Sequence, residues 1–137
     1  MYYIHPSTPQ TSAPHYYGDI VRKLLFSAAI LMLFGLPFFS ERLPVSLSGS
    51  LVVIIAVGFF AGLTNPIKSW TIFIDMVVSI LATIIFEYYA VVNYQTNSGA
   101  DWLFWIDQIL ALIFLFALYY STKTVRAMFL QRQTHDL

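Results

Sequence analysis

Four long apolar stretches, separated by short polar links, most constrain what this chain can fold into. They cover about residues 20–39, 47–63, 70–94 and 102–120. A helix that crosses a bilayer needs ~20 mainly apolar residues, whereas a membrane-spanning strand needs about half as many and alternates polar with apolar side chains. The four stretches are too long and too uniformly apolar for strands. The sequence therefore predicts four transmembrane helices.

The composition agrees with a membrane protein. Of the 137 residues, 58% are hydrophobic and 10% are charged, whereas an ordinary soluble domain carries roughly 25% charged residues. The net charge is zero and no basic stripe is present, so nucleic acid is not an expected partner. The chain has no cysteine, which excludes thiolate nucleophiles and cysteine metal sites. Membrane lipid is the expected surrounding.

The links between the apolar stretches predict the topology. They read "SERLP", "TNPIKS" and "QTNSGAD", and the last two contain the turn signals Asn65-Pro66 and Asn97-Ser98-Gly99. Short links make successive helices antiparallel neighbours. The expected fold is an all-α, up-down-up-down bundle of four transmembrane helices.

The distribution of lysine and arginine predicts the orientation. With four crossings, six basic residues fall on one side of the membrane: Arg22, Lys23, Lys68, Lys123, Arg126 and Arg132. The other side has only Arg42. Because short cytoplasmic segments carry an excess of basic residues, both termini are expected in the cytoplasm. The bias fits a bacterial inner membrane and a plasma membrane equally.

The two tails differ in character. Residues 1–19 form a Pro- and Tyr-rich segment without an apolar period, which predicts an extended or disordered cytoplasmic tail, or one held by a neighbouring subunit or by lipid headgroups. In residues 121–137, Val125, Met128 and Phe129 share a helical face and basic residues surround them. This pattern favours a short amphipathic helix on an anionic inner leaflet, the alternative being a partner-binding surface.

A line of polar residues follows the third stretch. Asp75, Ser79, Thr83 and Glu87 are spaced four apart, so the line drifts by ~40° per step along one side of a helix. A charge at the bilayer centre costs roughly 2.5–3.5 kcal/mol. One interpretation is structural, with the acids as interfacial caps and the hydroxyls bonded to helix carbonyls. The other is functional, with the line as a pore wall or ion-binding surface.

The functional interpretation adds residues of the fourth stretch. Asp107 and Glu87 are expected at similar depth near the outer end of adjacent antiparallel helices, and Gln108 could donate a hydrogen bond or ligate an ion. Two carboxylates in a low dielectric would require a proton or a cation. Repeated by symmetry, such carboxylates select cations. Because four packed helices leave little room for water, a pore would need a homo-oligomer, with Gly58 and Gly62 as candidate helix contacts.

The sequence offers little for catalysis. Its three histidines, His5, His15 and His135, lie in the tails, and neither a metal-ligand spacing nor a Gly-rich phosphate loop is present. Neither an enzyme nor a cofactor is expected. The leading hypothesis is a homo-oligomeric channel or binding pathway for a small cation or proton. The alternatives are a non-conducting accessory subunit of a larger membrane complex and a small transporter with a Glu87–Asp107 proton relay.

Overall fold

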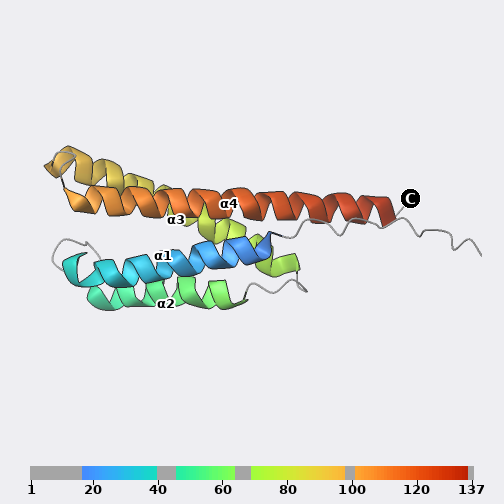
Figure 1. The fold of residues 1–137 in the computed structure, drawn as a ribbon, viewed down its shortest axis with the longest axis horizontal. Helices are drawn as coiled ribbons and strands as arrows, with labels where there is room; N and C mark the ends of the chain where they lie inside the picture. The colour runs from blue at the N-terminus through green and yellow to red at the C-terminus, as the bar shows by residue number, and fades with distance from the viewer. Residues whose placement is uncertain (1–16, 40–45, 64–68, 98–100, 136–137) are drawn as a thin grey trace, which may run out of the picture.

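The chain folds into four α-helices. The computed structural model describes residues 17–39, 46–63, 69–97 and 101–135. The helices are α1 (Gly18–Phe39), α2 (Leu47–Leu63), α3 (Ser69–Asn97) and α4 (Trp102–His135) (Figure 1). All regular structure within those residues is helical, so the prediction of an all-α fold with four helices is confirmed.

Three of the helices are long and apolar enough to cross a membrane. The qualifying segments are Gly18–Pro37 in α1, Trp70–Thr96 in α3 and Trp102–Thr134 in α4. α2 is equally apolar but has only 17 residues. At 1.5 Å per residue it measures ~26 Å, slightly less than a hydrocarbon core of ~30 Å. The structure therefore indicates a membrane protein, while a crossing by α2 stays a prediction.

The helices do not pack in chain order. α1 lies between α2 and α4, and α3 packs mainly on α4, crossing behind it (Figure 1). Consecutive helices run antiparallel, but α2 and α3 barely touch. The structure differs here from the expectation that all successive helices are packed neighbours. The reason lies in α1 and α4, whose small buried residues bring these two helices together and leave α2 at the edge of the molecule.

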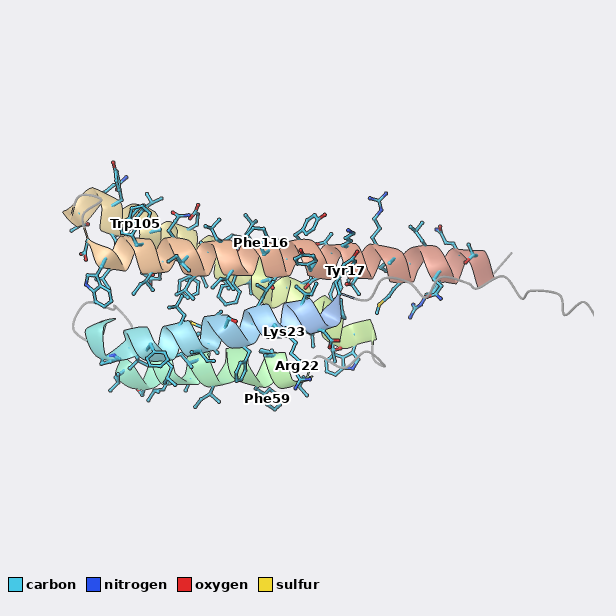
Figure 2. The ribbon with its side chains drawn as sticks, in the orientation of Figure 1. Tyr17, Arg22, Lys23, Phe59, Trp105 and Phe116 are labelled. Atoms are coloured by element: carbon cyan, nitrogen blue, oxygen red, sulfur yellow. The ribbon has the colours of Figure 1, made fainter. Side chains whose placement is uncertain are left out.

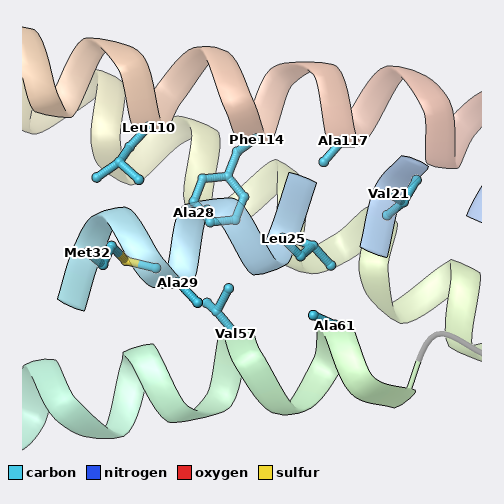
Figure 3. Packing of buried hydrophobic residues seen from close by; sticks show 10 residues of the cluster. All are labelled: Val21, Leu25, Ala28, Ala29, Met32, Val57, Ala61, Leu110, Phe114 and Ala117. Carbon is cyan, nitrogen blue, oxygen red and sulfur yellow. The ribbon is translucent and has the colours of Figure 1, made fainter. Parts of the chain in front are cut away.

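The hydrophobic core joins α1, α2 and α4 (Figure 3). Its buried members are Val21, Leu25, Ala28, Ala29, Met32, Val57, Ala61, Leu110, Phe114 and Ala117. Six of these ten residues are alanine or valine, and small side chains allow helix backbones to approach closely in membrane proteins. α3 joins the core through Phe86, whose ring stacks on that of Phe114 with centroids 5.6 Å apart.

The outside of the molecule is apolar on every helix. Phe59, Trp105 and Phe116 are each more than half exposed and lie on the outer surface (Figure 2). Phe34 of α1 and Ile84 of α3 are also largely exposed. Soluble monomers rarely expose such extensive apolar surface, whereas lipid-facing helices require it.

α4 continues far beyond its apolar part. The expected span ended near Tyr120 and a separate surface helix was expected in residues 121–137, but α4 runs without a break to His135. Its 34 residues measure ~51 Å, and its C-terminal part projects past the other helices (Figure 1). The residues after Tyr120 include neither glycine nor proline, so no local signal ends the helix.

Candidate functional site at the interface of α3 and α4

One stripe of α3 faces the protein interior, and it is polar at both ends. Asp75 and Asn93 are eighteen residues apart, which is about five helical turns, so both side chains leave the helix in the same direction. Ser79 lies next to Asp75 on this stripe, Phe86 occupies its middle and Ala90 lies toward Asn93. The end at Asp75 is called the inner end and the end at Asn93 the outer end, after the orientation expected from the sequence. The two polar ends are ~27 Å apart along the helix.

At the outer end of the stripe, an amide and a carboxylate join the two helices. Asn93 donates from Nδ2 to Oδ2 of Asp107 over 2.7 Å. Asp107 is 7% exposed, so its carboxylate lies inside the protein. Among the described residues, this amide is the side-chain partner that the structure gives Asp107. A hydrogen bond to a buried carboxylate is stronger than one between neutral groups.

Glu87 has a similar partner but a different exposure. Gln108 donates from Nε2 to Oε2 of Glu87 over 3.3 Å. Glu87 is exposed, whereas Asp107, beside Gln108 on α4, is buried. The structure thus brings Glu87, Asp107 and Gln108 to one interface, where each carboxylate accepts a hydrogen bond from an amide of the facing helix.

The inner end of the stripe is more deeply buried. Asp75 is 1% exposed, Ser79 is fully buried and Thr71 is 6% exposed. Asp75 and Thr71 both make polar or electrostatic contacts.

The polar line read from the sequence rotates out of the interface. From Asp75 to Glu87 the drift totals ~120°. Accordingly Asp75 and Ser79 are buried, Thr83 is half-buried and Glu87 is exposed. Thr83 donates from Oγ1 to the backbone oxygen of Ser79 over 2.7 Å, as expected for a hydroxyl within a helix. The four residues therefore do not line a single surface.

An apolar layer separates the two ends. The stacked rings of Phe86 and Phe114 lie in the middle of the interface, with Leu110 also buried there. Within the described residues, no continuous row of polar side chains connects Asp75 with Asp107 inside one chain. Inside one chain, the buried polar groups at the two ends of the stripe are therefore separate from each other.

Two buried hydroxyls stand out from the others. Among the described residues, the Oγ atoms of Ser79 on α3 and Ser121 on α4 are buried without a hydrogen-bond partner. The register of α3 against α4 sets the turns of these two serines opposite each other. In the contacting pairs Asn93–Asp107 and Phe86–Phe114, the two residue numbers add to 200. The numbers of Ser79 and Ser121 also add to 200. The antiparallel packing therefore brings their turns to the same level.

The inner end is also where α1 is attached to α4. The backbone N–H of Tyr17 donates to Oγ1 of Thr124 over 3.4 Å, and the Tyr17 ring lies 5.5 Å from that of Tyr120. Nζ of Lys123 lies 4.8 Å from the centre of the Tyr17 ring, a cation–π contact. Arg22 and Lys23 are exposed near this end (Figure 2).

The glycines proposed as helix contacts lie outside the core. Val57 and Ala61 of α2 are buried against α1. A Cβ atom added at Gly58 or Gly62 would meet nothing within 4 Å. These two glycines therefore take no part in the packing of the single chain.

Sequence reasoning missed Asn93 and Ser121. Asn93 could have been found, because its spacing from Asp75 puts both on one face of α3. Ser121 carried no such signal, since it follows the apolar stretch and the expected helix ended before it.

Among the described residues, no group of three or more His, Cys, Asp or Glu could hold a metal ion. Comparison with protein families, curated proteins and solved structures finds no match to this chain.

Proposed function

We propose that this chain is an integral membrane protein with four crossings and cytoplasmic termini, which assembles with copies of itself to bind or conduct a small cation or proton. The observation that supports this most is Glu87, an exposed carboxylate in the apolar part of α3. Its exposed neighbours include Ile84, Tyr88 and Ile109, all apolar or aromatic. Apart from the amide of Gln108, the described residues surround this carboxylate with apolar groups, so it needs a further polar environment.

The depth of Glu87 in the membrane sets the free-energy cost of leaving its charge in contact with lipid. It lies nine residues before Thr96, the end of the membrane-length segment of α3, or ~13 Å along the helix. That 27-residue segment measures ~40 Å, so a hydrocarbon core of ~30 Å centred on it would include Glu87. Leaving a charge there in contact with lipid costs roughly 2.5–3.5 kcal/mol at the bilayer centre and less toward the interface. A hydrated axis shared by several subunits removes this cost.

The neighbouring groups suit cation binding. Gln108 fixes one oxygen of Glu87 and leaves the other free to ligate. Asp107 provides a second negative charge, held in place by Asn93. Asp101, just before α4, adds a third acidic residue at the same end, and several acids at one mouth concentrate cations there.

An oligomer is required for conduction, because the aromatic layer of Phe86 and Phe114 closes the interior of one chain. A ring of subunits would instead place Glu87 of each copy around a common axis. Gly58 and Gly62, on the open side of α2, are the candidate contacts between copies.

The second candidate is an accessory subunit of a larger membrane complex. The C-terminal part of α4 favours it, because this part projects beyond the other helices and exposes Phe129 and Leu130 (Figure 1). In this case Glu87 would accept hydrogen bonds or an ion pair from a different membrane protein.

The oligomeric state separates the two candidates. We would measure the mass of the purified protein in detergent by light scattering, corrected for bound detergent. A single species of four or more subunits supports the channel, and a monomer supports the accessory subunit. For an oligomer, cation and proton flux into liposomes is then compared between the wild type and a Glu87→Gln/Asp107→Asn double variant. We expect the double variant to lose flux and an Asp19→Asn control, at an exposed acid in the first turn of α1, to retain it.

A further inference from the structure

We propose that Ser79, Ser121 and Asp75 form a buried binding site for a small monovalent cation, of which Na⁺ is the test case. This site lies at the opposite end of α3 from Glu87. It is internal to one chain, so it does not depend on the oligomer or on conduction.

The two serines differ from the other serine and threonine residues of these helices. Most other hydroxyl groups on these helices donate to the backbone oxygen four residues earlier. Those that do so are Ser27, Ser50, Thr83, Thr96, Thr122 and Thr124. Ser79 and Ser121 are fully buried, yet neither makes this bond. A buried hydroxyl without a partner is costly, so two of them at one interface indicate a ligand that both can bind.

The two serines also lie at the same level of the interface between α3 and α4. The register that joins Asn93 to Asp107 and Phe86 to Phe114 also sets the turn of Ser79 against the turn of Ser121. In a helix each side chain leans toward the N-terminus. Because α3 and α4 run in opposite directions, the two side chains lean in opposite directions from this shared level, and a ligand held between the two turns contacts both hydroxyls.

A buried carboxylate beside the serines supplies the negative charge that a cation site needs. Asp75 precedes Ser79 by one helical turn, on nearly the same face, and is 1% exposed. Asp75 has a contact of its own, but a carboxylate has two oxygens and about four acceptor positions, so it can keep that contact and still ligate. Carboxylate and hydroxyl oxygens are hard ligands that suit hard cations, with bound water completing the coordination. The single negative charge of the Asp75 carboxylate balances the charge of one monovalent cation.

Sodium-dependent stability tests the site. We would follow thermal unfolding of the purified full-length protein in detergent by tryptophan fluorescence, in NaCl and in choline chloride at equal ionic strength. A ligand that binds only the folded state raises Tm, and at concentrations far above Kd we expect a rise on the order of 5 °C. Ser79→Ala and Ser121→Ala should each abolish the rise. Thr122→Ala, which removes a hydroxyl bonded to its own helix, should retain it.

Two results of the unfolding measurements would overturn the cation site. If the two hydroxyls bind nothing, replacing them removes an unsatisfied polar group, so both alanine variants would unfold at a higher temperature than the wild type in either salt. That result overturns the proposal, and so does a wild type whose Tm is the same in both salts.

A direct measurement covers variants that fail to fold. Binding of ²²Na⁺ to the wild-type protein is measured by equilibrium dialysis, with excess unlabelled Na⁺ or choline as competitor. Displacement by Na⁺ alone supports the site, and absence of saturable binding refutes it. Glu87→Gln separates this proposal from the proposed function, because it should abolish flux and leave the sodium-dependent Tm unchanged.

Discussion

Asn93 on α3 and Asp107 on α4 are joined by a 2.7 Å hydrogen bond between Nδ2 and Oδ2. The pair lies close to the connection between the two helices, and its carboxylate is buried. It fixes the register of the most extensively packed helix pair in the molecule. The bond therefore links the stability of the fold to the geometry of the candidate outer site.

Removing the amide should destabilise the protein. In Asn93→Ala, the carboxylate of Asp107 stays buried but loses its donor, which we expect to lower the free energy of unfolding by about 1–3 kcal/mol. Unfolding is measured by titration with a denaturing detergent in mixed micelles. Gln95→Ala is the matched control, because Gln95 is exposed two residues further along α3, and it should change the stability little.

A double-mutant cycle tests whether this loss belongs to the pair. If the bond carries the effect, Asn93→Ala should cost much less when Asp107 is already replaced by alanine. Equal costs of Asn93→Ala in both backgrounds would show that Asn93 stabilises the protein through other contacts.

The aromatic layer should be the most sensitive part of the core. Phe114 is fully buried and stacks on Phe86, so Phe114→Ala leaves a cavity and should cost about 3–5 kcal/mol. Phe116, two residues away on the same helix, is 55% exposed. Phe116→Ala is therefore the natural control, and equal losses in the two variants under the same mixed-micelle titration would contradict the packing described.

The sequence predicts best the features that depend only on interactions between residues close together in the chain. A run of apolar residues of membrane length predicts a helix without knowledge of its neighbours, and α1, α3 and α4 are such helices. The end of α4 was missed for the same reason. Loss of hydrophobicity after Tyr120 predicts the end of the membrane span, but the residues that follow include neither glycine nor proline, so the helix itself continues.

The candidate site was harder to predict because it depends on packing between helices. The spacing of Asp75, Ser79, Thr83 and Glu87 indicated one polar line. Which part of that line is buried follows from the angle at which α3 meets α4. The pairing of Asn93 with Asp107 follows from the register, and a single sequence without its partner helix in place specifies neither.

Cysteine labelling tests the orientation. The wild-type chain has no cysteine, so single cysteines introduce the only reactive thiol. We expect Ser98→Cys, between α3 and α4, to react with a membrane-impermeant maleimide in intact cells. Thr134→Cys, near the end of α4, should react only after permeabilisation. The wild type is the unlabelled control, and the reverse pattern would place both termini outside.

The open side of α2 leads to the last prediction. Because an added Cβ at Gly58 or Gly62 meets nothing within 4 Å, alanine at either position should fit the single chain. Alanine also favours the helix over glycine by about 1 kcal/mol. We expect Gly58→Ala and Gly62→Ala to unfold at the same or a higher detergent concentration than the wild type. A loss of stability would show that another chain packs against this side.

Bulkier substitutions at the same place decide whether copies of the chain meet there. A leucine at Gly58 holds apart two helices that pack closely through glycine, so Gly58→Leu should lower the mass of the detergent-solubilised oligomer. Val52→Leu adds volume at an exposed position of the same helix and should leave the mass unchanged. If Gly58→Leu also keeps the wild-type mass, this side of α2 faces lipid, and the subunits associate through another surface.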